Sequence, residues 1–431
     1  MPGIVVVGLQ WGDEGKGKVV DLLSQNAKHV VRSQGGNNAG HTVVVDQTEY
    51  QFHLIPSGVV YPHTICYIAA GTVIDPKVLI DEMAKLEAAK VDFRDRIKIS
   101  PLAHVILDYH IQIDKLQEKF RGKFSLGTTG RGIGPCYADK VNRVGIRICD
   151  LVDEKILRER LKEIFSYKML EYPSLELGEE KFEELFAKFS LLGKKLKPFL
   201  TQVEVDLERA LQNNESVLLE GAHGFGLDTT FGSYPYVTSS STYSSGIIAG
   251  AGIGPTKVSH VIGVLKAYTT RVGSGALPTQ LPSEEEHLFL NHAEAREIGT
   301  TTGRKRRMGW LDCVAAKYSI AVNGVNSLAL MKLDILDSLP YIKVCVGYRS
   351  GGKVMDSYPY QKEEWEAVEP VYETLSGWKE STKECKSLED MPTNAKKYLR
   401  WIESYFKLPI HLISLGPQRS STIIVKNIFS S

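Results

Sequence analysis

A glycine-rich loop between a short apolar run and a helical segment places the strongest constraint on how this chain can fold. Ile4–Val7 is apolar and mostly β-branched, which predicts a strand buried on both faces. The next loop contains Gly12 and, after four intervening residues, Gly17-Lys18, most of the pattern whose backbone N–H groups hold nucleotide phosphates. Val19–Leu23 is best interpreted as a helix and Val30–Arg32 as a second strand. The opening therefore predicts a βαβ unit of an α/β fold.

The loop departs from the usual phosphate-binding pattern at the residue after its last lysine. Val19 stands where a Ser or Thr usually holds Mg²⁺, so either the match is accidental or another group holds the metal. Asp13, inside the loop, is a hard oxygen ligand suited to that task. The alternative interpretation is a glycine-rich turn with solvated lysines, but the strand before the loop and the helix after it favour phosphate binding.

Other segments of the chain carry clear periodic patterns. Short apolar runs predict further strands at Ser216–Glu220, Val261–Ala267, Ser327–Met331, Ile410–Ser414 and Thr422–Val425. Amphipathic patterns predict helices at Leu79–Lys90 and Asn394–Phe406, and residues 341–358 predict a hairpin. The charged helical stretch from Asp153 to about Asn214 predicts a helical subdomain or insertion.

Composition excludes several classes of protein. The 431 residues are 43% hydrophobic and 24% charged, as in an ordinary globular protein, and the formal net charge of +1 gives no global field for nucleic acid or an anionic membrane. The six cysteines are scattered without a Cys-x-x-Cys pair, which argues against a zinc site or a disulfide framework. Because neither a signal-peptide pattern nor an apolar stretch of about 18 residues is present, we expect a cytoplasmic protein.

A second polar glycine loop, Gln34–Thr42, follows the second predicted strand. The carboxyl ends of neighbouring parallel strands meet at one edge of a sheet, so the two loops are expected to converge. His41 in this loop suits a general acid or a donor beside developing phosphate charge. A lone histidine is more often satisfied by local hydrogen bonds, but the surrounding loop favours a functional role here.

Two later loops combine hydroxyl groups with cations. Gly127–Pro135 carries Thr128, Thr129 and Arg131 with free backbone donors, which suits a monophosphate, and Arg143 nearby either adds charge or is an ordinary surface residue. Thr300–Arg307 places four cations behind three hydroxyl groups. A nucleic-acid patch is the alternative for this run, but the flanking glycines and the neutral chain favour a loop that closes on anionic substrates.

Lys332 and Asp334 follow the predicted strand that ends at Met331. A carboxylate at this place accepts both N–H donors of the guanine edge, and a lysine stem packs on the ring. The pattern of three residues is weak alone, and an exposed turn is the alternative. With a phosphate loop upstream, it favours GTP over ATP.

Seven stretches together resemble the adenylosuccinate synthetase family over essentially the whole chain. They are Gln10–Lys18, Gly36–Thr42, Gly127–Pro135, Glu220–Ala222, Pro235–Ser240, Lys266–Gly273 and Thr301–Arg307. The family, whose bacterial form is nearest in length, condenses IMP with L-aspartate, using GTP, to give adenylosuccinate, GDP and phosphate. The resemblance implies one large, mainly parallel central sheet with surrounding helices. It also implies a single unit over residues 1–431, with the helical subdomain at about 153–214, that is active as a homodimer.

The resemblance also implies catalytic roles. Asp13 would take the proton from N1 of IMP, and it would ligate Mg²⁺ together with the carbonyl of Gly40. His41 would act as the acid at the β–γ bridge oxygen of GTP, and Lys16 would balance charge on the transferred phosphoryl group. His223 stands at a position that contacts the IMP base.

Three sets of binding residues follow from the same resemblance. GTP would be bound by Gly12, Asp13, Glu14, Gly15, Lys16, Gly17, Lys18, Gly40, His41, Thr42, Arg306, Lys332, Leu333, Asp334, Ser414, Leu415 and Gly416. IMP would be bound by Asp13, Glu14, Gly15, Lys16, Asn38, Ala39, Gly40, His41, Thr129, Arg143, His223, Thr238 and Arg304, with Arg143 contributed across the dimer. L-Aspartate would be bound by Thr300, Thr301, Thr302, Gly303, Arg304, Lys305 and Arg306.

One position departs from the family. The usual Glu-Gly-Ala-Gln-Gly is here Glu220-Gly221-Ala222-His223-Gly224. A neutral imidazole still donates one hydrogen bond, and at mildly acidic pH it can become cationic. We therefore expect retained activity with an altered pH profile.

Two other classes compete with a ligase. A regulatory GTPase switch would share the phosphate and guanine loops, but it gives no reason for the second glycine loop, the Thr128–Pro135 site or the cluster at Arg304. A nucleic-acid-binding protein is the more distant alternative, because the basic residues form only one short run.

Overall fold

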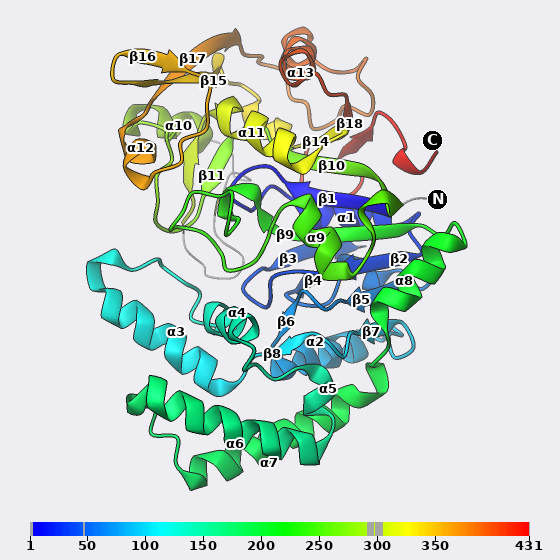
Figure 1. The fold of residues 1–431 in the computed structure, drawn as a ribbon. Helices are drawn as coiled ribbons and strands as arrows, with labels where there is room; N and C mark the ends of the chain where they lie inside the picture. The colour runs from blue at the N-terminus through cyan, green and yellow to red at the C-terminus, as the bar shows by residue number, and fades with distance from the viewer. Residues whose placement is uncertain (1–2, 46–47, 291–296, 298–304, 431) are drawn as a thin grey trace.

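The computed structural model describes residues 3–45, 48–290, 297 and 305–430. Its centre is a sheet of nine strands in the order β19-β18-β14-β10-β1-β9-β2-β5-β7 (Figure 1). Their bounds are β1 Gly3–Gly8, β2 His29–Arg32, β5 Ile65–Ile68, β7 Ile97–Ile99, β9 Val217–Gly224, β10 Val258–Lys266, β14 Ser327–Met331, β18 Ile410–Ser414 and β19 Thr422–Ile424. All neighbours pair in parallel except β18 and β19. The predicted large, mainly parallel sheet is confirmed.

Strand β1 shows why the sheet is buried on both sides. Val5 and Val7 belong to one hydrophobic cluster, whereas Ile4 and Val6 belong to another, because successive side chains point to opposite faces. Helices α8 Val203–Gln212, α9 Ser244–Ala251, α11 Cys313–Asn323 and α13 Thr393–Phe406 contribute to the first cluster. The second cluster is formed with α1 Lys16–Ser24, α2 Pro76–Ala88, α3 Asp108–Arg121, α6 Glu154–Glu171 and α7 Glu179–Leu196.

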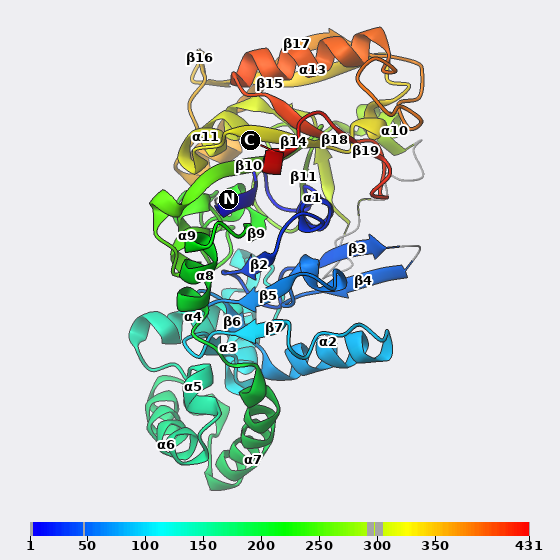
Figure 2. The same ribbon diagram turned by 90° about the vertical axis from the view of Figure 1, so that its right-hand side faces the viewer.

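The stretch from 153 to 214 is helical, as its charge pattern predicts. Helices α6, α7 and α8 occupy it, with short 3₁₀ turns at Pro173–Leu175 and Lys197–Phe199. The rings of Phe165 and Phe182 pack edge to face at 5.5 Å between α6 and α7. In both views α5 (Ile148–Leu151), α6 and α7 lie together at one end of the molecule (Figures 1 and 2). That this stretch forms a subdomain of its own stays a prediction.

A smaller sheet lies at the opposite end. It consists of β13 Leu311–Asp312, β15 Tyr341–Ser350, β16 Lys353–Met355 and β17 Glu369–Ser376. The predicted hairpin is its β15–β16 pair, and β17, which the sequence patterns did not indicate, pairs antiparallel with β15. Figure 2 shows α13 packed across this end.

The remaining elements surround the edge of the main sheet. The strands β3 His41–Val45 and β4 Thr48–Phe52 pair antiparallel, and four short strands form two further pairs, β6 Val73–Ile74 with β8 His104–Val105 and β11 Thr269–Arg271 with β12 Arg307–Gly309. The other helices are α4 Ile133–Asn142, α10 Ser283–Leu290 and α12 Lys362–Ala367. Among the described residues, no helix is both long and apolar enough to cross a membrane.

Candidate active site

A cavity of about 480 Å³ opens at the edge where the parallel strands end. This is where ligands bind in open α/β sheets. The cavity wall includes fourteen of the residues predicted from the sequence, which are Gly12, Asp13, Gly15, Lys16, Gly17, Lys18, Asn38, Ala39, Gly40, Thr129, His223, Thr238, Arg306 and Lys332. The convergence of the loops after β1 and β2 is therefore confirmed.

The loop between β1 and α1 has the backbone of an anion site. Gly12, Asp13 and Gly15 all have positive φ, at 91°, 59° and 94°, a region that glycine enters freely and aspartate tolerates. Helix α1 begins at Lys16, and no side chain caps its start. Its first N–H groups therefore remain available to a phosphate, with the helix dipole adding to the attraction.

Glu14 supports this loop from inside. Its side chain is fully buried, and Oε1 accepts hydrogen bonds from the N–H groups of Gln10 at 3.1 Å and Gly12 at 2.9 Å. Its Oε2 pairs with Lys16 Nζ at 2.5 Å. The carboxylate is thus a structural part of the loop, and only the backbone of Glu14 is left to contact a nucleotide.

Lys18 joins the phosphate loop to the loop after β18. Its Nζ donates to Ser414 Oγ and to the carbonyl of Gly416, both at 2.7 Å. Burial lowers the pKa of Lys18 to about 8, although Asp334 and Asp21 oppose this shift. The structure therefore brings together two segments that the sequence assigned to GTP from opposite ends of the chain.

The second glycine loop and the loop before α4 form the opposite wall. Asn38 Nδ2 donates to Thr238 Oγ1 at 3.2 Å, so two predicted IMP residues are in direct contact. Buried Asp114 accepts from Thr128 Oγ1 and from the N–H of Gly132, both at 2.9 Å. It holds the loop that carries Thr129 beside the cavity.

His223 lies on the cavity wall near the end of β9 with a positive φ of 61°. Its Nδ1 is buried without a hydrogen-bond partner. Burial, with smaller contributions from Arg32 and Lys16, lowers the pKa of His223 to about 3. The expectation that this histidine becomes cationic at mildly acidic pH is therefore wrong. The imidazole stays neutral, with one donor and one acceptor for a ligand.

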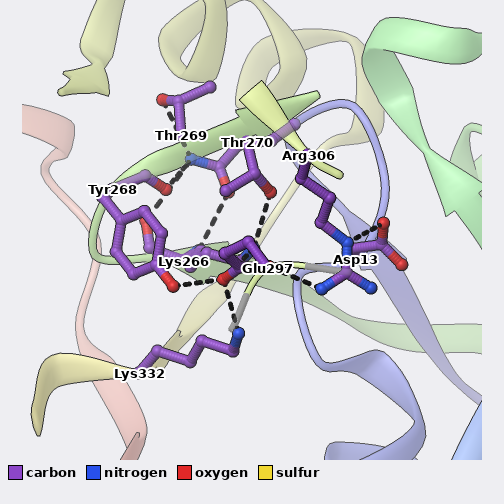
Figure 3. A network of polar contacts seen from close by, with 9 residues as sticks. Asp13, Lys266, Tyr268, Thr269, Thr270, Glu297, Arg306 and Lys332 are labelled. Atoms are coloured by element: carbon purple, nitrogen blue, oxygen red, sulfur yellow. Dashed lines mark hydrogen bonds and ion pairs between the residues drawn. The ribbon is translucent and has the colours of Figure 1, made fainter. Parts of the chain in front are cut away.

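A network of charged groups occupies the corner of the cavity between β1, β10 and β14 (Figure 3). Arg306 Nε donates to Asp13 Oδ2 at 2.7 Å, and Arg306 Nη1 donates to Glu297 Oε2 at 2.5 Å. Lys332 Nζ donates to Glu297 Oε1 at 2.6 Å. Asp13 and Lys332, assigned to opposite ends of GTP, are thus linked through two intervening side chains.

Other predicted residues fall away from the cavity or outside the described part of the chain. Arg143 is an exposed residue at the end of α4, with a positive φ of 64°. Lys305 lies beside a second, smaller hollow of about 190 Å³. Leu333 and Asp334 are buried in the turn after β14, and Leu415 is buried after β18. The predictions for Thr300, Thr301, Thr302, Gly303 and Arg304, and those for the side chains of His41 and Thr42, lie outside the described residues.

Sequence reasoning missed Glu297 altogether and gave no separate role to Arg271. Arg271 is 1% exposed, lies over the Trp11 ring at 5.6 Å and donates to the carbonyls of Ala276 and Tyr236. It also lines the cavity. Glu297 has no motif around it, and the predicted cations of the site were already explained by anionic substrates, so no sequence signal indicated it.

The fold and the cavity are those expected of a nucleotide-dependent α/β enzyme. A sequence profile of the adenylosuccinate synthetase family matches residues 5–423. The chain is 47% identical to the adenylosuccinate synthetase of Caldanaerobacter subterraneus, covering 98% of this chain and 99% of that one. It is also 47% identical to the Synechocystis enzyme of the same name, with 99% and 96% covered.

A solved structure gives the same result in three dimensions. The fully ligated adenylosuccinate synthetase of Plasmodium falciparum superimposes with a TM-score of 0.91 at 39% identity, over 98% of this chain and 99% of that one. The chain belongs to the adenylosuccinate synthetase family. It is a ligase of purine biosynthesis that joins IMP and L-aspartate in a GTP-dependent reaction. Because the match extends over nearly the whole chain, the alternative of a regulatory GTPase is not favoured.

Proposed function

We propose that the cavity carries out this ligation in two steps, through 6-phosphoryl-IMP. The observation that carries the proposal is that Asp13, Lys16, His223 and Lys332 all line one cavity. GTP would lie between the phosphate loop and the loops at Lys332–Asp334 and Ser414–Gly416. IMP would lie against Asn38, Thr129 and Thr238, whose donors suit its phosphate.

In the first step, Asp13 removes the proton from N1 of IMP, so that electron density moves to O6. O6 then attacks the γ-phosphorus of GTP, and the bond to the β–γ bridge oxygen breaks. His41 donates a proton to that oxygen as GDP leaves. Lys16 and the uncapped N–H groups of α1 balance charge on the phosphoryl group during transfer.

Asp13 and the carbonyl of Gly40 would hold Mg²⁺ beside the phosphates. The described residues contain no cluster of three or more acidic, histidine or cysteine ligands. This fits a metal that takes one or two protein oxygens and completes its shell with phosphates and water. The Asp13 side chain is 26% exposed and faces the cavity, which suits this role. When bound, the ion would supply charge neutralisation at the phosphates.

In the second step, the amine of L-aspartate attacks C6 and inorganic phosphate leaves. The two substrate carboxylates must be held during this attack, and we assign this task to residues 300–306, with Arg304 foremost. The neutral imidazole of His223 would donate one hydrogen bond near O6 in place of the usual glutamine amide.

Arg143 would reach the IMP phosphate of a second subunit in a homodimer. It is exposed and absent from the wall of its own cavity. Val141, two residues before Arg143, is also exposed, at 76%. We also place the enzyme in the cytoplasm, where its six free cysteines would stay reduced.

Isotope exchange tests the two-step route. GTP carrying ¹⁸O at the β–γ bridge is incubated with the enzyme, a magnesium salt and IMP, without aspartate. Reversible transfer to O6 frees the β-phosphate of GDP to rotate, so the label is expected to move to a non-bridging position. Asp13→Asn should abolish this movement. Full ligase activity without any exchange would contradict the intermediate.

A further inference from the structure

Glu297 is a buried carboxylate that none of the substrate assignments uses. It is 4% exposed and meets three segments that end at the cavity. Its Oε1 accepts from Lys332 Nζ, just after β14, and at 3.4 Å from Lys266 Nζ, the last residue of β10. Its Oε2 accepts from Arg306, just before β12, and the tie is doubled by a backbone bond from Arg306 N–H to the Glu297 carbonyl at 2.9 Å.

The charges around Glu297 keep it ionised. Burial alone would raise its pKa, but Lys266, Lys332 and Arg306 together hold the pKa of Glu297 well below its usual range. Tyr268 donates a further hydrogen bond to Oε1. A buried carboxylate with this many donors is an organising centre for the three basic side chains, and it is the ion-pair partner of both Lys266 and Lys332.

Arg306 contacts its two carboxylates through different nitrogens. Nε faces Asp13, and Nη1 faces Glu297 (Figure 3). Arg306 donates to only one oxygen of Asp13, Oδ2. A turn of the guanidinium toward incoming phosphates would free this oxygen as well, and the Glu297 contact is the one that can persist during such a movement.

Lys266 contacts Glu297 in the protein interior and is not part of the cavity wall. It is fully buried, and its Nζ also donates to Thr270 Oγ1 at 2.6 Å on β11. Lys332 and Arg306, by contrast, line the cavity. The network thus has one inner lysine that fixes the carboxylate and two outer basic side chains that the carboxylate presents to a ligand.

We propose that Glu297 is a positioning residue for phosphoryl transfer. It anchors Arg306, so that the guanidinium can pass from Asp13 to the phosphates of GTP without leaving the cavity, and it sets Lys332 beside the guanine. This inference rests on the roles proposed above for Asp13, Arg306 and Lys332. It predicts two separable kinetic effects, one on turnover through Arg306 and one on GTP affinity through Lys332.

Glu297→Gln tests the proposal, because glutamine keeps the size and one acceptor oxygen but removes the charge. We expect kcat to fall about tenfold or more and KM for GTP to rise by a similar factor, with KM for IMP changed less than about twofold. Glu285→Gln is the matched control. That carboxylate accepts from Trp310 Nε1 at 2.6 Å and Lys343 Nζ at 2.5 Å, away from the cavity wall. It should leave all three constants unchanged.

A double-mutant cycle with Arg306→Ala separates positioning from a merely structural role. If Glu297 acts on turnover through Arg306, adding Glu297→Gln to Arg306→Ala should lower kcat by less than about twofold. If Glu297→Gln lowers kcat by the same factor in the Arg306→Ala background as in the wild type, this inference is overturned, while the proposed ligase mechanism is unaffected. Wild-type kinetics for Arg306→Ala overturn both the role proposed for Arg306 and this inference. Should Glu297→Gln not fold, Glu297→Asp, which keeps the charge but shortens the reach, enters the same cycle with the same criteria.

Discussion

Lys18 Nζ and Ser414 Oγ lie 2.7 Å apart, although 396 positions separate the two residues in the chain. The contact joins the proposed phosphate loop to the GTP-binding segment Ser414–Gly416, because the same ammonium also donates to the carbonyl of Gly416. A nucleotide that bridges the two loops would meet a site already assembled before it binds. Such preorganisation lowers the cost of binding.

Removing the ammonium should therefore weaken GTP binding selectively. Lys18→Met keeps most of the aliphatic stem but cannot donate to either partner. We expect KM for GTP to rise about tenfold, with KM for IMP nearly unchanged. Steady-state kinetics with each substrate varied in turn measure both constants. An equal rise in both would contradict a role confined to the GTP side.

The same residue predicts a pH dependence at the alkaline side. With its pKa near 8, Lys18 loses its proton as the pH rises through that value, and KM for GTP should then rise in the wild type but not in Lys18→Met. The effect on folding has the opposite sign. Between about 8 and the ordinary value of 10.5 the unfolded chain holds a proton that the native state has released, so this group alone makes the native state more stable as pH rises.

His223 should leave the pH profile of activity unchanged. Because its pKa is lowered to about 3, the imidazole is neutral throughout the range in which the enzyme is assayed. Rate–pH curves of the wild type and His223→Gln should therefore superimpose in shape between about pH 5.5 and 8, even if their heights differ. An inflection near pH 6 in the wild type alone would contradict this prediction.

The lowered pKa of His223 also makes the native state less stable at acidic pH. Below pH 6.5, the ordinary value, the unfolded chain binds a proton at His223 that the native state rejects until about pH 3. The native state thus loses stability as the pH falls through this window. Urea unfolding at pH 7 and pH 4.5 should show a smaller loss for His223→Gln than for the wild type.

Glu14 is predicted to stabilise the folded protein through the loop between β1 and α1. Glu14→Ala leaves the N–H groups of Gln10 and Gly12 without their acceptor and Lys16 without its partner. We expect a loss of about 2–4 kcal/mol in the free energy of unfolding, since buried donors without partners each cost about 1–3 kcal/mol. Glu159→Ala, on the exposed side of α6, is the control and should change the free energy by less than about 0.5 kcal/mol. Equal unfolding midpoints for the two variants would argue against this account of the loop.

Mixing two inactive variants tests the contribution of Arg143 across a dimer. Asp13→Asn and Arg143→Leu each remove one component of every site, but a mixed dimer contains one complete site. If subunits exchange freely, an equal mixture should recover about a quarter of wild-type activity, because half the dimers are mixed and half their sites are intact. Variants that are each inactive and stay inactive after verified exchange would show that Arg143 acts within its own subunit.

The sequence predicted most of the main sheet because its strands are short, apolar and bounded by polar loops. Val30–Arg32 and Ser327–Met331 lie within or coincide with observed strands. Strand β17 was not predicted, because its residues do not alternate between buried and exposed positions. It pairs only with β15, which is itself partly buried. The loops that form the site were predictable from the sequence. The pairing of Lys18 with Ser414 was not, because it depends on which strands become neighbours, and local sequence patterns do not encode the order of the strands.

Glu297 and His223 mark the limit of reasoning from residue types. The glutamate became visible only when three cations from separate segments were placed around it. For His223, the sequence indicated an ionisable group, but its charge state follows from burial beside Arg32 and Lys16. In both cases the chemistry is set by neighbours that are distant in sequence.

Phosphate release from GTP distinguishes a ligase of IMP and L-aspartate from a nucleotide switch. The enzyme is assayed with Mg²⁺, GTP, IMP and L-aspartate together and then with each substrate omitted, while ultraviolet absorbance follows the purine. A ligase must show phosphate release and the spectral change only when all three substrates are present, in equal amounts. Hydrolysis of GTP that proceeds at the same rate without IMP and aspartate would contradict the ligase function. It would favour a nucleotide switch instead.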